Sequence, residues 1–443
     1  MKRHIIVFLS CLTVFTAGLR GNEATAAFEK NYESLTYRLY NEQKWDSLLV
    51  TGEEAIAKGY DYYYMRVRTG VAAFELFKFV KASKHFEKAL EFNAEDAFAS
   101  ELLYKSYLYS GRNEEARLFL HQLPEFISSS FTGKTAGPVI FVETGPVFSN
   151  HSEQFEKNRQ QGDGLYSEAY PNLNAFYFLS GIIIPVKGRI SLNASAALPN
   201  FNKRRIVDIA GLDSLSGDYK VKQTELYFSP SVVLGHHIKI SPVVRWVNVS
   251  LDNPLSSDDP EIQQYIGPPG SYTYQDYAIG GEVSFLQKKW MASVGYYSVK
   301  LDNTDLNQAN FSFFYRPLGN LNLYLQSVMG LRMTDSENDL YFSQMAGGKL
   351  AGKLWAEATF VTGNISGTGE NNFQVFYNLF DETKSKYALR FIYTINDHLK
   401  LNLRGQWFFK QGTELYFSEP DKGEVYTYNY QTISLTGGFS WNF

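Results

Sequence analysis

The sequence has 443 residues, a formal net charge of −4 and an isoelectric point of about 6.0. This length leaves room for two or three domains, and the acidic balance excludes the basic excess that nucleic-acid-binding proteins normally carry. Beyond the N-terminus no run of about 18 apolar residues occurs, so no membrane-spanning helix is expected. Aromatic residues make up 16% of the chain, with 31 Tyr and 34 Phe. Such a composition suits boundaries between water and an apolar environment, where a tyrosine ring is in the apolar part and its hydroxyl meets water.

The first residues have the pattern of a secretory signal. Lys2 and Arg3 are followed by an apolar stretch at residues 5–14 and then by small residues, which predicts a signal peptide over residues 1–26. A short buried helix and a lipid anchor on Cys11 are the alternatives. Cys11 is the only cysteine, so the processed chain would have neither disulfides nor thiol chemistry.

Residues 28–125 follow helical periodicity. Within them, small residues let two antiparallel helices approach closely, and Phe86 fills the space between helical units. The same spacing of packing positions recurs one helical unit further along the chain. The packing positions are Gly70, Ala82, Phe86, Ala89, Leu103, Tyr107, Ala116 and Leu120.

This spacing resembles the tetratricopeptide repeat (TPR), a helical hairpin of about 34 residues. About three repeats fit, of which the first and last are degenerate, and Ala94 stands where the repeat usually has proline. An ordinary helical bundle is the alternative. The resemblance implies a protein-binding surface without catalytic groups.

After a linker at residues 126–136, residues 137–443 alternate with period two. Short polar turns alternate with long polar connections, and residues 200–217 and 411–425 are among the expected long loops. This alternation is typical of an up-and-down barrel in an outer membrane. We expect about 14 strands, with 12 or 16 as alternatives, and we interpret residues 372–380 as a hairpin within a loop. A soluble sandwich or stacked sheets would be the other explanation. The predicted fold class is therefore α + β multidomain, with a short helical repeat domain before an antiparallel transmembrane β-barrel.

Each strand has one apolar and one polar face. Leu399, Leu401 and Leu403 share one face, whereas Lys400 and Arg404 share the other. A sheet of this size closes around a wide interior, which these strands have too few apolar residues to fill, so we expect the apolar face to meet lipid. The side chains expected to line the lumen are Glu282, Glu357, Arg390, Lys400 and Arg404.

The sequence offers no persuasive catalytic, cofactor or metal site. None of the seven histidines lies on a strand face beside a Ser and an Asp, so a Ser-His hydrolase in the outer loops is a weak alternative. We interpret the adjacent His236 and His237 as a polar turn rather than a metal site, and the acids of residues 256–261 as a solvated loop rather than a calcium site. Residues 367–372 (GTGENN) have turn chemistry and lack the Lys-Ser/Thr of a phosphate-binding loop. We therefore predict a protein that is not an enzyme and needs no cofactor.

The last strand alternates strictly and ends in an aromatic residue. Leu435, Phe439, Trp441 and Phe443 lie on its apolar face. Together with the signal, the repeats and the Tyr-rich barrel, this layout resembles the exopolysaccharide export porins, although no residue motif specific to that group is present. The resemblance implies that the terminal strand is the signal read by the barrel assembly machinery.

This layout predicts a pore or transport protein in the outer membrane of a Gram-negative cell, with its helical domain in the periplasm. The expected partners are outer-membrane lipid, the assembly machinery and a periplasmic protein docked on the repeats, with polysaccharide as a candidate substrate. A non-conducting anchor, scaffold or adhesin is the alternative.

Overall fold

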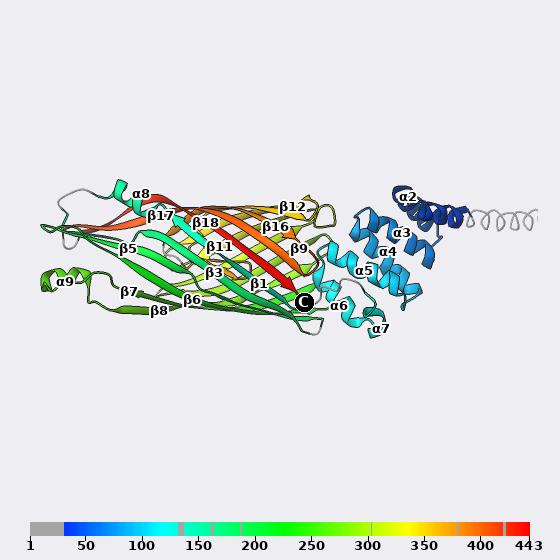
Figure 1. Ribbon diagram of the computed structural model, residues 1–443, viewed down its shortest axis with the longest axis horizontal. Coiled ribbons are helices and arrows are strands. Elements are labelled where there is room, and N and C mark those ends of the chain that lie inside the picture. The colour runs from blue at the N-terminus through cyan, green and yellow to red at the C-terminus, as the bar shows by residue number, and fades with distance from the viewer. Residues whose placement is uncertain are drawn as a thin grey trace, which may run out of the picture. The chain divides into compact units, whose positions relative to one another are not determined.

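The computed structural model describes residues 31–131, 137–160, 164–186, 188–302, 304–378, 381–419 and 422–443. The predicted signal peptide and the end of the predicted linker lie outside these residues. The chain divides into two compact units, a helical unit up to about residue 132 and a barrel unit that follows it. Each unit is described by itself (Figure 1).

The helical unit is a series of antiparallel helical hairpins. Residues 31–41 are helical. Equivalent helices recur every 34 residues, because α2, α4 and α6 begin at Trp45, Phe79 and Asn113. None of the helices among the described residues combines the length and hydrophobicity needed to cross a lipid bilayer. The remaining helices of this unit are bounded as follows: α2 Trp45–Ala57, α3 Tyr63–Glu75, α4 Phe79–Phe92, α5 Ala97–Tyr109, α6 Asn113–Gln122 and α7 Glu125–Ser128.

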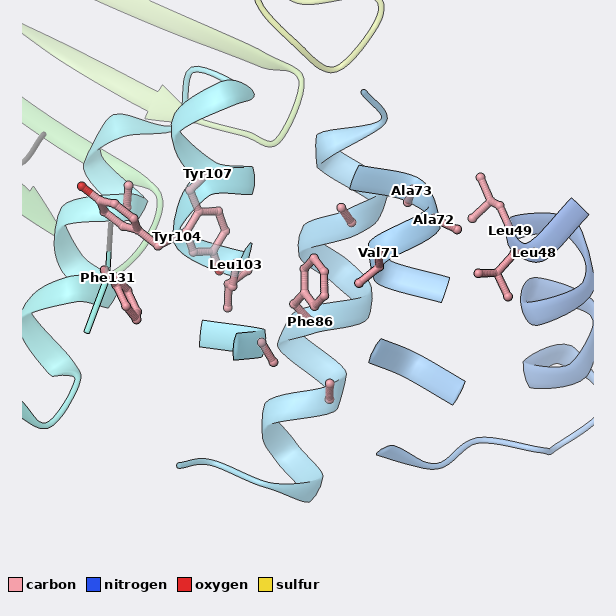
Figure 2. Close-up of a cluster of buried hydrophobic side chains, with 14 of the residues drawn as sticks. Leu48, Leu49, Val71, Ala72, Ala73, Phe86, Leu103, Tyr104, Tyr107 and Phe131 are labelled. Carbon is pink, nitrogen blue, oxygen red and sulfur yellow. The ribbon is translucent and has the colours of Figure 1, made fainter. Parts of the chain in front are cut away.

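One continuous apolar core joins these helices (Figure 2). Phe86 of α4 is fully buried in it, together with Leu48 of α2 and Leu103 of α5. Gly70 permits the close approach of α3 and α4, since a Cβ there would lie 2.8 Å from Cε1 of Phe86. Ala82, Ala89 and Ala116 are also fully buried, Tyr107 is buried, and Leu120 packs against the core.

The second unit is a closed antiparallel β-barrel. β1 pairs with β18 on one side and with β3 on the other, which closes the sheet. Within the described residues the sheet contains 16 strands, but β2 continues into β3 and β4 into β5 after two-residue interruptions, so the wall has 14 strands. This architecture confirms the predicted fold class and excludes the sandwich.

The barrel elements alternate short turns at one end with longer connections at the other. Two short helices, α8 and α9, lie at the end opposite the C-terminus (Figure 1). The bounds are β1 Val139–Ser149, α8 His151–Asn158, β2 Tyr166–Ala169, β3 Asn172–Pro185, β4 Ile190–Ala197, β5 Asn200–Ile209, β6 Leu215–Leu234, β7 Ile238–Asp252, α9 Pro260–Ile266, β8 Ser271–Leu286, β9 Trp290–Leu301, β10 Thr304–Tyr315, β11 Leu323–Met333, β12 Asn338–Ala351, β13 Leu354–Thr362, β14 Gly369–Glu370, β15 Val375–Phe376, β16 Glu382–Thr394, β17 Leu399–Glu419 and β18 Lys422–Asn442.

The barrel is apolar outside and polar inside. Ile279 and Leu403, for example, are 55% and 51% exposed on the outer face, whereas Ser434 and Thr436 of β18 are buried. The outward series on β18 is Ile433, Leu435, Phe439 and Trp441, all exposed. This distribution is the reverse of that in a soluble barrel and matches a wall whose solvent is lipid.

Three connections differ from the sequence-based expectation. Residues 200–217 were expected to form a loop, but β5 pairs with β6 there. Residues 411–425 were likewise expected to form a loop, but β17 and β18 continue their ladder through most of this range. Polar side chains suggested loops in both ranges. Strands form there nonetheless, because hydrogen bonds between neighbouring strands pair the backbone N–H and C=O groups whether the side chains face solvent, lipid or the lumen. The acidic 256–261 segment leads into α9, where Asp259 accepts a hydrogen bond from the Glu261 amide and so caps the helix.

Candidate functional site

The barrel encloses a cavity of about 460 Å³, lined by polar and aromatic side chains from most of the wall. Four of the five side chains expected in the lumen line it: Glu282, Glu357, Arg390 and Arg404. Lys400 shares the strand face of Arg404, but it is exposed near the turn end of β17 and does not line the cavity.

Most charges on the wall are paired with a charge of opposite sign on another strand. Arg404 of β17 lies 3.2 Å from Glu143 of β1, and Thr436 also donates to Glu143. Arg390 of β16 lies 3.5 Å from Glu357 of β13. Pairing lowers the cost of holding these charges in a confined interior, so the lumen is polar without a large excess of either sign.

A folded segment occupies the lumen. Residues 364–378, which we call the plug, form most of the described part of the connection from β13 to β16. They contain the small hairpin β14–β15, which forms a separate two-stranded sheet. The stretch around residue 372 therefore adds no strand to the wall, as the sequence predicted. Phe373 at the hairpin tip is fully buried against Tyr297 of β9, with ring centroids 4.6 Å apart.

Hydrogen bonds attach the plug to opposite parts of the wall. Arg245 of β7 donates to the carbonyl oxygens of Phe373 and Gln374 at 3.1 and 2.7 Å, and it pairs with Glu225 of β6. Arg245 is only 2% exposed. These contacts place a buried cation directly against the hairpin tip.

Further contacts hold each side of the hairpin. Gln308 of β10 both donates to the Gly369 carbonyl and accepts from its amide, at 2.9 and 2.8 Å. Lys386 of β16 lies 2.7 Å from Glu370. Asn372 donates to Ser229 of β6 at 3.0 Å.

The backbone of the plug tip is strained. Asn371, Asn372 and Phe373 have positive φ angles of 52°, 54° and 62°. Left-handed conformation costs a residue such as Phe373 about 1–2 kcal/mol, whereas Asn adopts it more readily. Such strain persists where the surroundings fix it, and it favours the release of the tip once the wall contacts are lost.

A second polar cluster lies where β1 gives way to α8. His151 stacks on Tyr430 with ring centroids 3.7 Å apart, and its Nε2 lies 2.7 Å from the Tyr428 hydroxyl. Its Nδ1 accepts from the Asn172 amide at 3.0 Å. Burial lowers the pKa of His151 to about 4 despite the nearby Asp381, so the ring is neutral at physiological pH. The serine in contact with His151 is Ser149, which accepts from its backbone amide at 3.2 Å; none of the hydrogen bonds described for the ring involves a serine.

The sequence did not single out Arg245, Glu225, Lys386 or Glu370. The alternation of residues along each strand could have placed the three wall residues, Arg245, Glu225 and Lys386, on the lumen face. Glu225 and Arg245 also stand out because they interrupt otherwise apolar or neutral runs. Glu370 was assigned only to a turn, because nothing local shows that this turn folds back into the lumen. Among the described residues, no group of three or more His, Cys, Asp or Glu is arranged to hold a metal ion.

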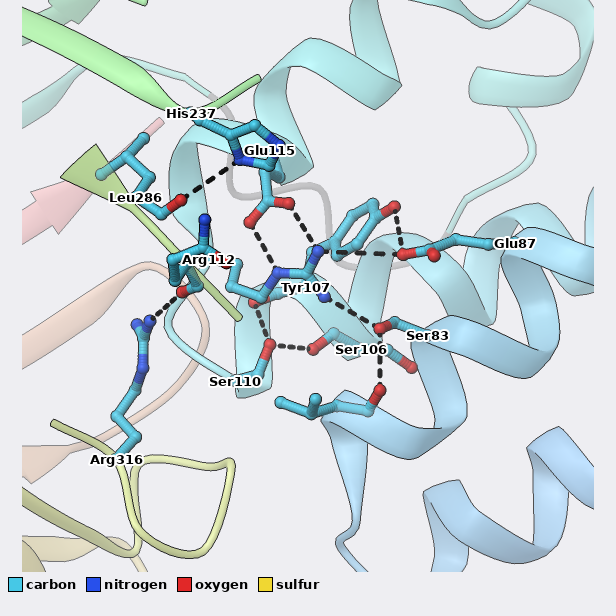
Figure 3. A network of polar contacts seen from close by, with 12 residues as sticks. Ser83, Glu87, Ser106, Tyr107, Ser110, Arg112, Glu115, His237, Leu286 and Arg316 are labelled. Carbon is cyan, nitrogen blue, oxygen red and sulfur yellow. Dashed lines mark hydrogen bonds and ion pairs between the residues drawn. The ribbon is translucent and has the colours of Figure 1, made fainter. Parts of the chain in front are cut away.

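The helical unit carries its own buried polar network (Figure 3). Arg112 is buried and makes two hydrogen bonds to the Glu115 carboxylate and one, of 2.8 Å, to the Ser83 hydroxyl. Its guanidinium lies 4.4 Å from the Tyr107 ring centroid, and the Tyr107 hydroxyl donates to Glu87 at 3.1 Å. Burial raises the pKa of Tyr107, so its hydroxyl stays protonated as a donor. The network joins α4, α5 and α6.

Neither a protein-family model nor a characterised protein matches the sequence. Among solved structures, the Pseudomonas putida toluene transporter TodX matches with a TM-score of 0.43 and 9% identity, over 73% of this chain and 93% of TodX. A Pseudomonas aeruginosa FadL homologue matches with a TM-score of 0.43 and 8% identity, over 76% of this chain and 94% of the homologue. The translocator domain of the autotransporter NalP from Neisseria meningitidis matches with a TM-score of 0.30 and 11% identity, over 76% and 99% of the two chains. These likenesses assign no substrate or site to this chain.

Proposed function

We propose that this protein is an outer-membrane channel for small solutes whose lumen is closed by the plug. The observation that carries the proposal is the combination of a lipid-compatible outer face with a polar, plugged interior. A barrel that served only as an anchor has no need of a separate segment fixed inside it. The secretory pattern of the sequence and its aromatic terminal strand agree with an outer-membrane location.

The size of the cavity favours a small solute. A volume of about 460 Å³ holds a ligand of modest size. An extended polysaccharide would need the whole plug to leave the lumen, whereas a small solute needs only the hairpin tip to move. We therefore place polysaccharide second among the candidate substrates.

Cross-linking the plug to the wall tests this proposal. The double variant Ser229→Cys/Asn372→Cys joins positions whose side chains lie 3.0 Å apart, and the only native cysteine, Cys11, belongs to the predicted signal. In planar bilayers or in liposome-swelling assays, oxidation or a short bis-maleimide should abolish solute flux, and reduction of the disulfide should restore it.

Each single-cysteine variant serves as a matched control and should be insensitive to oxidation. Unchanged flux in the fully cross-linked double variant would contradict a route through the plugged lumen. A folded barrel that conducts nothing in any state, plug-deleted variants included, would favour the anchor instead.

We further propose that the helical unit is a TPR-like domain that docks a periplasmic protein. Helices at 34-residue intervals support this, and so do Tyr64 and Phe98, which occupy equivalent positions on α3 and α5 and are both exposed. Replacing both with Ser should abolish capture of the partner in cross-linking pull-downs from envelope extracts while channel flux persists. Capture that is unaffected by the double variant would remove this surface from consideration.

A further inference from the structure

The charges that line the cavity do not all pair. Five cations line it, namely Arg245, Lys386, Arg390, Arg404 and Lys410, and so do five carboxylates, namely Glu143, Glu225, Glu282, Glu357 and Glu370. Four cations form ion pairs with four of these carboxylates. Lys410 and Glu282 remain without an ion-pair partner within the described part of the chain.

Lys410 and Glu282 lie at different levels of the barrel. Glu282 is close to the turn end of β8, near Leu286, and accepts a hydrogen bond from Ser284. Lys410 lies past the middle of β17, opposite Tyr430 of β18. The two groups therefore do not neutralise each other. The part of the cavity toward the longer connections, where Lys410 lies, carries the unbalanced positive charge.

The surroundings of Lys410 reinforce that charge. Its side chain is largely enclosed, with only 6% of the residue exposed, and it borders the cavity. Lys203 of β5 lies opposite Asn172 in the ladder with β3, and the Asn172 side-chain amide donates to the Tyr430 hydroxyl at 3.1 Å. Lys203 and Lys410 therefore approach the same polar cluster. Asp381 is the nearby carboxylate, but one of its oxygens already accepts hydrogen bonds from Tyr430 and Asn172, at 2.6 and 3.0 Å.

Lys410 and Lys203 thus have one nearby carboxylate, that of Asp381, between them, and the adjacent His151 is neutral. Enclosing an ammonium without a counter-ion is unfavourable, and a bound anion would relieve that cost. Hydrogen bonds between ammonium and carboxylate groups are among the stronger polar contacts in proteins.

Aromatic rings beside Lys410 define the rest of the ligand. Its Nζ lies 5.8 Å from the centroid of the Phe408 ring, and Phe408 packs edge-on to Tyr377 of the plug at 6.3 Å. We infer that Lys410, assisted by Lys203, forms a binding site for the anionic group of a small organic acid whose apolar body lies against Phe408 and Tyr377. This inference rests on the proposed channel and names its substrate class.

Binding of benzoate to the full-length protein in nanodiscs tests the inference without requiring transport. Isothermal titration should give saturable binding of benzoate, with benzyl alcohol and benzylamine at least tenfold weaker. Lys410→Met should weaken benzoate binding at least tenfold, whereas Lys410→Arg should retain most of it. Lys400→Met is the matched control, because Lys400 lies on the same strand outside the cavity, and it should change nothing.

Equal binding of benzoate and benzyl alcohol, or unchanged binding in Lys410→Met with the barrel still folded by heat-modifiable gel mobility, would overturn the inference. Binding of inorganic phosphate in preference to benzoate would overturn the organic-acid assignment. Solute flux that the plug controls, without binding of either anion, would refute this site and leave the channel standing. Benzoate binding through Lys410 in a barrel that never conducts would support this binding site and refute the proposed channel.

Discussion

Arg245→Met should open the channel by freeing the plug tip. The substitution keeps a long apolar side chain in the wall but removes the guanidinium that donates to the carbonyls of Phe373 and Gln374. It also leaves Glu225 buried without its cation, so Arg245→Met should be combined with Glu225→Gln to keep the wall neutral. The plug then loses two hydrogen bonds from a charged donor.

The size of the effect follows from those two bonds. A hydrogen bond to a charged group contributes about 1.5–3 kcal/mol, so losing both weakens the closed state by about 3 kcal/mol at the low end. Each 1.4 kcal/mol is a factor of ten, so the open-to-closed ratio should rise about a hundredfold. The left-handed backbone at residues 371–373 acts in the same direction, because release relieves its strain.

Single-channel recording in planar bilayers measures this ratio as open probability. Arg390→Met with Glu357→Gln is the matched control: it removes an Arg–Glu wall pair on neighbouring strands for which no plug contact is described. This control should leave open probability unchanged. Equal effects of the two double variants, or no change in Arg245→Met/Glu225→Gln, would refute the view that these plug contacts hold the lumen closed.

Three further outcomes test other parts of the molecule. Deleting Phe443, or changing it to Asp, should reduce insertion of newly made barrel in cells more than it lowers the melting temperature of barrel already folded; unimpaired assembly would remove the proposed role of this terminus. Gly70→Ala should destabilise the helical unit by about 1–3 kcal/mol in urea unfolding, since the added methyl meets Phe86, and Phe86→Leu should rescue much of that loss; additive effects would contradict the contact. Glu115→Ala should destabilise the same unit by about 2–4 kcal/mol, because it leaves the buried Arg112 without its main partner; a loss below about 0.5 kcal/mol, the range of ordinary surface changes, would contradict this.

The helical unit could be anticipated because its information is local. Small residues at helical spacing, such as Ala82 and Ala89, mark the buried faces, and the same phase recurs one unit later. Helix starts at Trp45, Phe79 and Asn113 have the predicted interval. Sequence alone did not reveal the Arg112 network, since Ser83 and Arg112 lie 29 residues apart and meet only when the helices pack.

The barrel itself was also determined by the sequence, because alternation with period two sets which side chains face lipid and which face the lumen. That rule gave the inward orientation of Glu282, Glu357, Arg390 and Arg404. The alternation of short turns with long connections gave the count of about 14 strands. The contents of the lumen were decided only by tertiary structure. Whether Glu370 meets Lys386, or Arg245 meets the carbonyl of Phe373, depends on where a loop folds after the sheet has closed. Arg245 and Phe373 are 128 positions apart, and no local pattern encodes a contact over that separation.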